Sequence, residues 1–469
     1  MRTRDTTLTT DQKALQINLD KFKYGSIVEI GAGQEVARRF FHVGAAAGTI
    51  AKTMSAYDMA VSDSIYGHAD RYVSRTRLLQ MLDKEYNQVV ERLSEVRSKN
   101  TTFFAYAATV TARSFRQQNE CHGWIGVRLQ LHPGAAPSDV IMHVRMLDAT
   151  NAQQSEALGI LGVNLIHGAF FHHDQPEWVV EGLADGLGSD RIEVDLIHFS
   201  GPYFEEVENR LMNLHLIRSW LTRAVVFNPQ GEVVVPGDLF YRKPVLVMRG
   251  SFKPVTCVNI DMMRTARQQF CQQEHVEEAS LLALAEITMN SLISGDNVDG
   301  ADFLARIDLL ASQGYMVMIS DYVRYFRLRA YLRRYTQKPI GIVLSVRDFN
   351  NLFDEKYYEG LEGGILEAFG KLFPDNTHVY VYPARANGGD ELTTLHNVQV
   401  PANLRHLLAH LIGNGKLFAI EPQDHSHLHI DATGVLAALR RGPGAWEQEV
   451  PTAVAEMIAQ RRLLGYDSE

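Results

Sequence analysis

Short apolar runs that alternate with helical sequence fill the second half of the chain and constrain its fold most strongly. Six such runs are TRAVVF, PVLVMRG, SLLALAEIT, YMVMISD, KPIGIVLSV and THVYVYP, and helical sequence separates all of them except the first pair. Short buried strands joined by helical crossovers are typical of a parallel sheet that is covered on both faces. We therefore expect an α/β protein whose second half is a Rossmann-like, mostly parallel sheet with flanking helices.

The first half of the chain has a different pattern. TTFFAYAATVTARS, WIGVRLQL and SDVIMHVRML are three β-rich runs separated by turn-forming residues, which predicts an antiparallel meander in a mixed α+β half. We expect four regions: a mainly helical region at 1–98, an α+β domain at 99–235, a Rossmann-like nucleotide-binding domain at 236–400 and a helical tail at 401–469.

Composition excludes several classes of partner. The net charge is −9 and no run of five like charges occurs, so we expect no nucleic-acid partner. No stretch approaches about 18 uninterrupted apolar residues, and no apolar run follows the first arginines, so we expect neither a membrane segment nor a secretory signal. Three scattered cysteines favour the reducing cytoplasm. The composition is compatible with a homo-oligomer.

One strand, turn and helix stand out as a candidate phosphate site. In VLVMRGSFKPVT the apolar run ends at Met248, Gly250 permits a turn, and a helix is expected to begin near Val258. Ligands of open α/β sheets bind where strands end and helices begin, because helix N-termini present unpaired N–H groups to anions. Arg249 and Lys253 flank that point and would add positive charge.

The same stretch resembles the nucleotidylyltransferase superfamily, whose first strand is followed by G-[ST]-F-x-P-[VI]-[HT]-x-G-H. The matching residues are Gly250, Ser251, Phe252, Pro254, Val255 and Thr256. The whole chain is also similar to a bacterial family often labelled nicotinate-nucleotide adenylyltransferase. The resemblance implies an enzyme of NAD biosynthesis that uses ATP and Mg²⁺. It would transfer the adenylyl group to a phosphorylated small molecule such as nicotinate mononucleotide.

The resemblance also implies roles for individual residues. Arg249, Gly250, Ser251 and Phe252 would bind the nucleotide, and Lys253, Thr256 and Asn259 would be catalytic. Val258 and Asn259 replace the closing Gly-His of the family. Asparagine can donate a hydrogen bond but cannot carry a charge, and losing one transition-state donor typically costs about 100- to 1000-fold in rate. A non-catalytic nucleotide sensor or assembly subunit is therefore the alternative.

A second signature of that family, I-S-S-[ST]-x-[VI]-R, has a partial match in MISDYVRYF. Ile319, Ser320, Val323 and Arg324 fit it. The match is short, and chance is an equally good explanation for it.

A different enzyme, with its site in the N-terminal half, is a further alternative. Period-two alternation places Glu120 and His122 on one face of a strand, and His143 and Arg145 on one face of the next. Such a cluster could transfer protons or hold a phosphorylated substrate, and a solvated sheet face would explain it equally well.

IVEIGAGQEV resembles the E-x-G-x-G turn of Rossmann-type methyltransferases, which would bring a methyl donor to Gly31 and Gly33.

Two groups of residues could bind metals, but we predict no metal site. Glu193 and Asp195 share a strand face and could bind Mg²⁺ with a triphosphate, although a polar edge strand explains them as well. His425, His427 and His429 would share a face if extended. We interpret them as part of a surface loop, because no support shell for zinc is recognisable.

Overall fold

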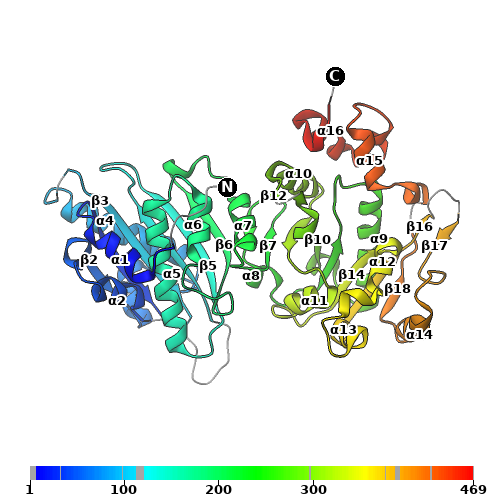
Figure 1. Cartoon of the computed structure of the whole chain (residues 1–469), viewed down its shortest axis with the longest axis horizontal. Helices are drawn as coiled ribbons and strands as arrows, with labels where there is room; N and C mark the ends of the chain where they lie inside the picture. Colours follow the sequence, from blue (N-terminus) through cyan, green and yellow to red (C-terminus); the bar gives the residue numbers. More distant parts are fainter. Residues whose placement is uncertain are drawn as a thin grey trace. The chain divides into compact units, whose positions relative to one another are not determined.

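A computed structural model describes residues 7–31, 33–97, 99–111, 121–294, 297–374, 376–385, 391–422 and 425–467. The chain forms two compact units, Met1–Arg223 and Ala224–Glu469, here called unit 1 and unit 2 (Figure 1). Unit 2 begins before the expected residue 236, because two short strands at 224–227 and 233–234 join its sheet.

Unit 1 contains a six-stranded mixed sheet in the order β2-β1-β3-β4-β5-β6. Its strands are β1 (Lys23–Ile30), β2 (Ile50–Met54), β3 (Thr102–Val110), β4 (Cys121–Leu129), β5 (Ser138–Met146) and β6 (Ile192–Ser200). β1 is parallel to both β2 and β3, whereas β3, β4, β5 and β6 pair antiparallel in succession. The three β-rich runs of the sequence therefore form the expected meander, at β3 to β5.

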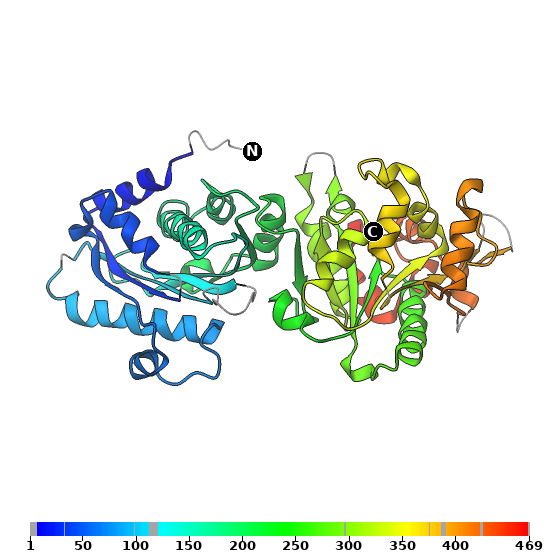
Figure 2. The same cartoon turned by 90° about the horizontal axis from the view of Figure 1, so that it is seen from below.

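Helices cover both faces of this sheet (Figure 2). They are α1 (Thr10–Leu19), α2 (Glu35–His42), α3 (Met59–Tyr66), α4 (Arg75–Leu93), α5 (Asn151–Phe171), α6 (Pro176–Leu183) and α7 (Asn209–Arg218). α4 packs on one face, where Leu78 and Leu82 lie against Gly126 of β4. α2 and α5 pack on the other face, where Phe40 and Leu161 belong to the main hydrophobic core.

Unit 2 contains an eight-stranded sheet in the order β18-β15-β14-β9-β10-β13-β7-β8. Its strands are β7 (Ala224–Phe227), β8 (Val233–Val234), β9 (Val245–Arg249), β10 (Leu282–Thr288), β13 (Met316–Ser320), β14 (Ile340–Ser345), β15 (Thr377–Tyr382) and β18 (Leu417–Ala419). Six of them pair in parallel with their neighbours, whereas β7 pairs antiparallel with β13 and β8 pairs antiparallel with β7. Two hairpins, β11 (Ile293–Ser294) with β12 (Asn297–Val298) and β16 (Ala384–Arg385) with β17 (Leu392–Thr393), lie outside this sheet.

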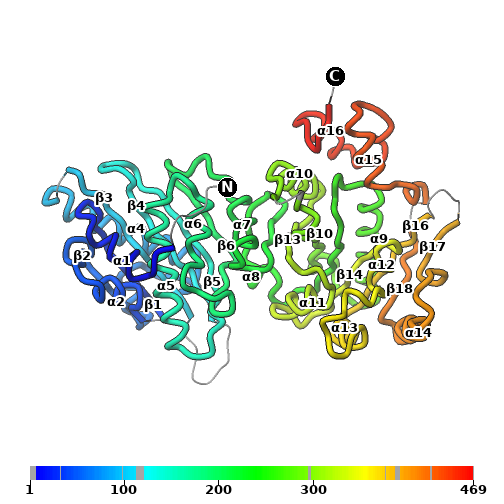
Figure 3. Tube along the Cα trace, in the orientation of Figure 1, coloured from blue at the N-terminus to red at the C-terminus, as the bar shows by residue number. Residues whose placement is uncertain are grey.

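The six parallel strands follow the doubly wound order of Rossmann folds. Counted along the chain from β9, their spatial order is 3-2-1-4-5-6, so the winding reverses between β9 and β14. Figure 3 traces the crossovers that join them. The fold class expected from the apolar runs is therefore confirmed.

Helices connect the parallel strands of unit 2, and further helices form its C-terminal segment. They are α8 (Pro236–Phe240), α9 (Cys257–Glu274), α10 (Gly300–Ala311), α11 (Tyr325–Arg333), α12 (Val346–Leu352), α13 (Gly364–Leu372), α14 (Arg405–Gly413), α15 (Ala432–Leu439) and α16 (Thr452–Arg461). In the part of the chain that the structure describes, none of the helices combines the length and apolar character needed to cross a membrane.

Close packing at the centre of the sheet explains one glycine. Gly341 of β14 faces Phe270 of α9 and Leu246 of β9, and a Cβ at this position would lie 2.6 Å from a methyl carbon of Leu246. A larger residue would push α9 away from the sheet. Helix α9, which follows β9, therefore packs closely against the sheet at the point where the strand order reverses.

Candidate functional site

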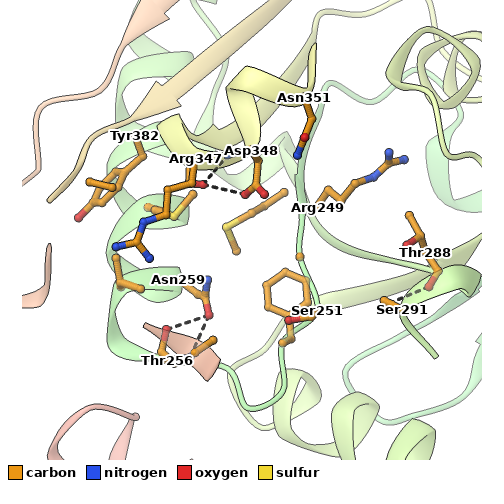
Figure 4. Close-up of a pocket in the computed structure, with 18 of the residues that line it drawn as sticks. Arg249, Ser251, Thr256, Asn259, Thr288, Ser291, Arg347, Asp348, Asn351 and Tyr382 are labelled. Carbon is orange, nitrogen blue, oxygen red and sulfur yellow. Dashed lines mark hydrogen bonds between the residues drawn. The ribbon is translucent and has the colours of Figure 1, made fainter. Parts of the chain in front are cut away.

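A cavity of about 500 Å³ lies at the carboxyl ends of the parallel strands of unit 2 (Figure 4). Residues that follow β9, β10, β13, β14 and β15 contribute to its wall, and a segment before α15 completes it. The cavity thus includes the position where the strand order reverses, which is where open α/β sheets bind their ligands. Among the lining residues are Gly250, Ser251, Asn259, Asn290, Arg324, Tyr325, Arg347, Asp348, Asn351, Tyr357, Tyr358 and Tyr382.

The turn after β9 is shaped by Gly250 and Phe252. The Gly250 N–H donates to the carbonyl of Glu286 on β10, at 3.0 Å. Phe252 is buried and adopts φ 46°, which folds its ring back over Gly250. A Cβ at Gly250 would lie 2.9 Å from that ring, so a larger residue could be accommodated only if the ring of Phe252 moved.

Thr256 and Asn259 form the start of α9. The side-chain oxygen of Asn259 accepts hydrogen bonds from the backbone N–H and the hydroxyl of Thr256, both at 3.0 Å. Thr256 is fully buried, and its hydroxyl is directed at Asn259. Because both donors take the oxygen of Asn259, its amide nitrogen is turned into the cavity (Figure 4). Asn259 therefore presents a neutral hydrogen-bond donor at this point.

Arg249 is held by an ion pair with Glu286. Its guanidinium donates two hydrogen bonds to the Glu286 carboxylate, which is fully buried, and further bonds to the carbonyls of Tyr322 and Val323 at 2.6 and 2.7 Å. The guanidinium also lies over the ring of Tyr325, 4.4 Å from its centroid. Arg249 thus joins the ends of β9, β10 and β13, and Glu286 compensates its charge.

Lys253 lies outside the lining of the cavity. Its ammonium group pairs with Asp302 of α10 at 2.9 Å, and Asp302 also binds Arg306. Lys253 therefore joins the turn to α10.

Arg324 and Arg347 are the other two cationic residues of the lining. Arg324 is the residue before α11, and within the described ranges its guanidinium makes no hydrogen bond or ion pair. Arg347 extends from α12 into the cavity and contacts Asp431 at 3.3 Å, in a pair whose members are both partly exposed (Figure 4). The turn motif does not reveal Arg324, but the partial match to the second family signature contains it.

Aromatic side chains provide much of the remaining wall, from Tyr325, Tyr357, Tyr358 and Tyr382. Tyr382 donates to Asp261 at 2.5 Å and Tyr358 to the carbonyl of Leu352 at 2.9 Å, so both rings are fixed. Burial raises the pKa of Tyr358 to about 12. This phenol therefore stays neutral at physiological pH.

The alternative site in unit 1 is a buried hydrogen-bond network. His122 and His143 lie on one sheet face, with Nδ1 of His122 3.1 Å from Nε2 of His143, as expected. Nδ1 of His143 lies 2.6 Å from the buried carboxylate of Asp195. Arg145 instead pairs with Glu193 at 2.6 Å. Glu120 lies outside the described residues.

The structure does not arrange either of the two candidate metal-binding groups, Glu193 with Asp195 or the histidines at 425–429, as a set of metal ligands. Glu193 and Asp195 are bound to Arg145 and His143, and His425–His429 forms a short 3-10 helix. Over the residues with described positions, no group of three His, Cys, Asp or Glu side chains is arranged to hold a metal ion.

The glycine turn after β1 is filled by a side chain of the protein. Gly31 and Gly33 have φ of 102° and 84°, while the carboxylate of Glu29 accepts the N–H groups of Val36 and Ala37 in the first turn of α2, both at 3.1 Å. Burial raises the pKa of Glu29 to about 7. The first N–H groups of α2, which would face a bound anion, therefore bind Glu29.

Comparisons with known proteins add little to this picture. No protein-family model matches the chain, and no curated protein matches its sequence. Solved structures that resemble it include the nicotinic acid mononucleotide adenylyltransferase of Plasmodium falciparum in complex with NaAD. The two sequences are 10% identical, the match covers 48% of this chain and 99% of that chain, and the TM-score is 0.31.

Others belong to the competence-damage group. The CihA protein of Agrobacterium tumefaciens has 14% identity, 34% of this chain and 97% of that chain covered, and a TM-score of 0.25. A CinA-superfamily protein of Escherichia coli has 11% identity, 36% and 92% coverage, and a TM-score of 0.24. Scores this low leave the function to be inferred from the cavity itself.

Proposed function

We propose that unit 2 binds a nucleoside triphosphate in the cavity at the strand-order reversal and transfers its nucleotidyl group to a phosphorylated small molecule. The observation that carries the proposal is the position of Arg324, whose guanidinium makes no hydrogen bond or ion pair with the described residues, in a cavity of about 500 Å³ at this point of the sheet. Such a volume is within the range of about 300–1,000 Å³ that small-molecule sites occupy.

Three groups would bind the phosphates. Arg324 would contribute charge and a planar set of donors that matches phosphate oxygens. The amide nitrogen of Asn259 would contribute a neutral donor, and the turn at Gly250 and Ser251 allows the backbone to approach closely. Arg249 would act by holding the strand ends together, since Glu286 compensates its charge.

The tyrosines would bind the base. Flat aromatic faces stack on every nucleobase, typically for about 1–3 kcal/mol per base. Tyr325 and Tyr357 suit this role best, because their side chains are partly exposed, whereas Tyr358 and Tyr382 are only 5% and 1% exposed.

The proposed reaction needs no base from the protein. An anionic phosphate oxygen of the acceptor would attack the α-phosphorus of ATP, forming a new P–O bond while the bond to the bridging β-phosphate oxygen breaks and pyrophosphate leaves. Catalysis of such in-line transfers is mainly positioning and charge stabilisation. Mg²⁺ would neutralise the phosphates. It commonly takes one or two carboxylates, several waters and the phosphates themselves, so Asp348 in the lining fits it.

A nucleotide sensor without catalysis is the second candidate. The neutral Asn259, in place of the imidazole that the family resemblance implies, is the observation that favours it. The two functions share one pocket and differ only in turnover.

The deciding experiment is pyrophosphate release by the purified protein with ATP, Mg²⁺ and nicotinate mononucleotide. Release should fall about 100-fold or more in Arg324→Ala, as when a transition-state donor is lost. Arg405→Ala, which removes an exposed arginine that is not among the lining residues, should leave it unchanged. Thermal stabilisation by ATP without pyrophosphate release from any phosphorylated acceptor would favour the sensor.

A further inference from the structure

A second cavity adjoins the first and is built by the C-terminal segment of unit 2. It has a volume of about 390 Å³ and lies between α15 and the loop that leads to Trp446. Asp431 lines both cavities, so they meet at its side chain. The segment also reaches the start of α9, where the N–H of Cys257 donates to the carbonyl of Glu449 at 2.9 Å.

The sizes of the two cavities suit two substrates. About 500 Å³ is in the lower part of the range for small-molecule sites and holds one nucleotide-sized ligand. A transfer reaction must hold a donor and an acceptor side by side, because its rate depends on their proximity and alignment. The second cavity, of about 390 Å³, shares Asp431 with the first and so offers an adjoining space for an acceptor.

One cationic residue of the second cavity is available to an anion. Of the two carboxylates in its lining, Asp431 pairs with Arg347 at 3.3 Å, and Glu449 lies 3.7 Å from His429, a contact that is an ion pair only if the imidazole is protonated. Arg441 also lines the cavity, and across the described residues its guanidinium takes part in no hydrogen bond or ion pair. One arginine is therefore left to bind a ligand.

The wall that carries Arg441 is held in place. Gly442 has φ 101°, and a Cβ there would lie 3.1 Å from the carbonyl oxygen of Asp467, so the turn requires glycine. Trp446 is buried and its indole N–H donates to the carbonyl of Gly442 at 2.9 Å. Gly444, where an added Cβ would meet nothing within 4 Å, leaves the rim open to a ligand.

We propose that this second cavity binds the phosphorylated acceptor, with Arg441 contacting its phosphate and the Arg347–Asp431 pair at the border between acceptor and nucleotide. The inference rests on the proposed function of the first cavity.

Binding measurements on the full chain separate the two ideas. Calorimetry gives the dissociation constant of a non-hydrolysable ATP analogue with Mg²⁺, and then, with the analogue saturating, the dissociation constants of nicotinate mononucleotide and ribose 5-phosphate. Arg441→Ala should weaken the two phosphorylated probes about 10- to 100-fold, as expected for a lost hydrogen bond to a charged group, and leave the ATP analogue unaffected. Arg405→Ala is the matched control.

A second variant tests whether Arg441→Ala weakens binding through a change of structure rather than through the lost charge. Ala438→Phe fills the cavity from α15 without removing a charge and should weaken the same probes while the melting temperature stays unchanged. Unchanged probe binding in both variants, weakened binding of the ATP analogue in Arg441→Ala, or no probe binding to the parent protein would each overturn the acceptor site. Failure of the ATP analogue to bind the parent protein would overturn the proposed function instead.

Discussion

Arg249 donates two hydrogen bonds to the buried carboxylate of Glu286, and this ion pair joins the carboxyl ends of β9 and β10. Ser320 of β13 donates to the same carboxylate, so three neighbouring strands meet at one side chain. This ion pair and the Ser320 hydroxyl therefore hold together the strand ends that border the cavity, whereas the guanidinium of Arg324 in the lining has no hydrogen bond or ion pair with a described residue.

Glu286→Gln should destabilise unit 2 strongly, because the variant leaves the charge of Arg249 buried without its counter-ion. Breaking a buried ion pair by removing one partner typically costs about 3–5 kcal/mol. Urea unfolding followed by circular dichroism would measure the loss. Glu277→Gln removes an exposed carboxylate and should change stability by less than about 0.5 kcal/mol. Equal effects of the two variants would contradict the structural role of the pair.

ATP should raise the melting temperature of unit 2 through Arg324 rather than through Lys253. A ligand that binds only the folded state at a hundredfold excess over its dissociation constant adds about 2.7 kcal/mol of stability. Arg324→Ala should remove most of the shift. Lys253→Ala should retain it, because Lys253 pairs with Asp302 away from the cavity lining.

Differential scanning fluorimetry with and without ATP would measure these shifts. A shift that survives Arg324→Ala and disappears in Lys253→Ala would reverse the assignment of the phosphate-binding cation.

The turn itself is tested by Gly250→Val. The added side chain would displace the ring of Phe252 and crowd the backbone that faces the cavity, so the thermal response to ATP should be lost. A variant that melts normally and still responds to ATP would show that the turn does not contact the nucleotide.

Asn259→His should introduce a pH dependence that the parent protein lacks at this position. An asparagine amide does not titrate, whereas an imidazole with its ordinary pKa of about 6.5 is charged only below that value. Pyrophosphate release by the variant should therefore rise as pH falls from about 8 to 6, relative to the parent protein. Identical pH profiles of the two proteins would place residue 259 outside the transition state.

Glu29 should make unit 1 less stable as pH rises. Its pKa is raised by burial from 4.5 to about 7, so the folded state binds the proton more tightly than the unfolded chain does. The resulting stabilisation is complete below about pH 4.5 and is lost as pH rises through about 7. A shift of this size corresponds to about 3 kcal/mol.

The difference between parent and Glu29→Gln isolates this effect from the other carboxyl groups. Equilibrium unfolding of both proteins at pH 5 and pH 8 should show that the advantage of the parent shrinks or reverses at pH 8. A constant difference would mean that Glu29 titrates at its ordinary pKa in the folded protein.

Local sequence predicted the strand, the turn and the helix at 244–270, because apolar runs, glycine and helical periodicity act over a few residues. The parallel sheet followed from five repetitions of that pattern. His122 and His143 were also placed together correctly, since antiparallel neighbours in a meander bring alternate residues onto one face. The sequence pointed to Arg324 only through the partial match of MISDYVRYF to the second signature of the family.

What the tertiary structure decided is which charged residues remain available to a ligand. Arg249 and Lys253 flank the turn in sequence, yet Glu286 and Asp302, which lie in later elements, compensate their charges. The wall that contains Asp431 and the cavity beside it come from a segment more than a hundred residues beyond the turn. Short-range patterns reveal where a strand ends. Charge compensation depends instead on distances of a few ångströms between side chains that only the folded chain brings together.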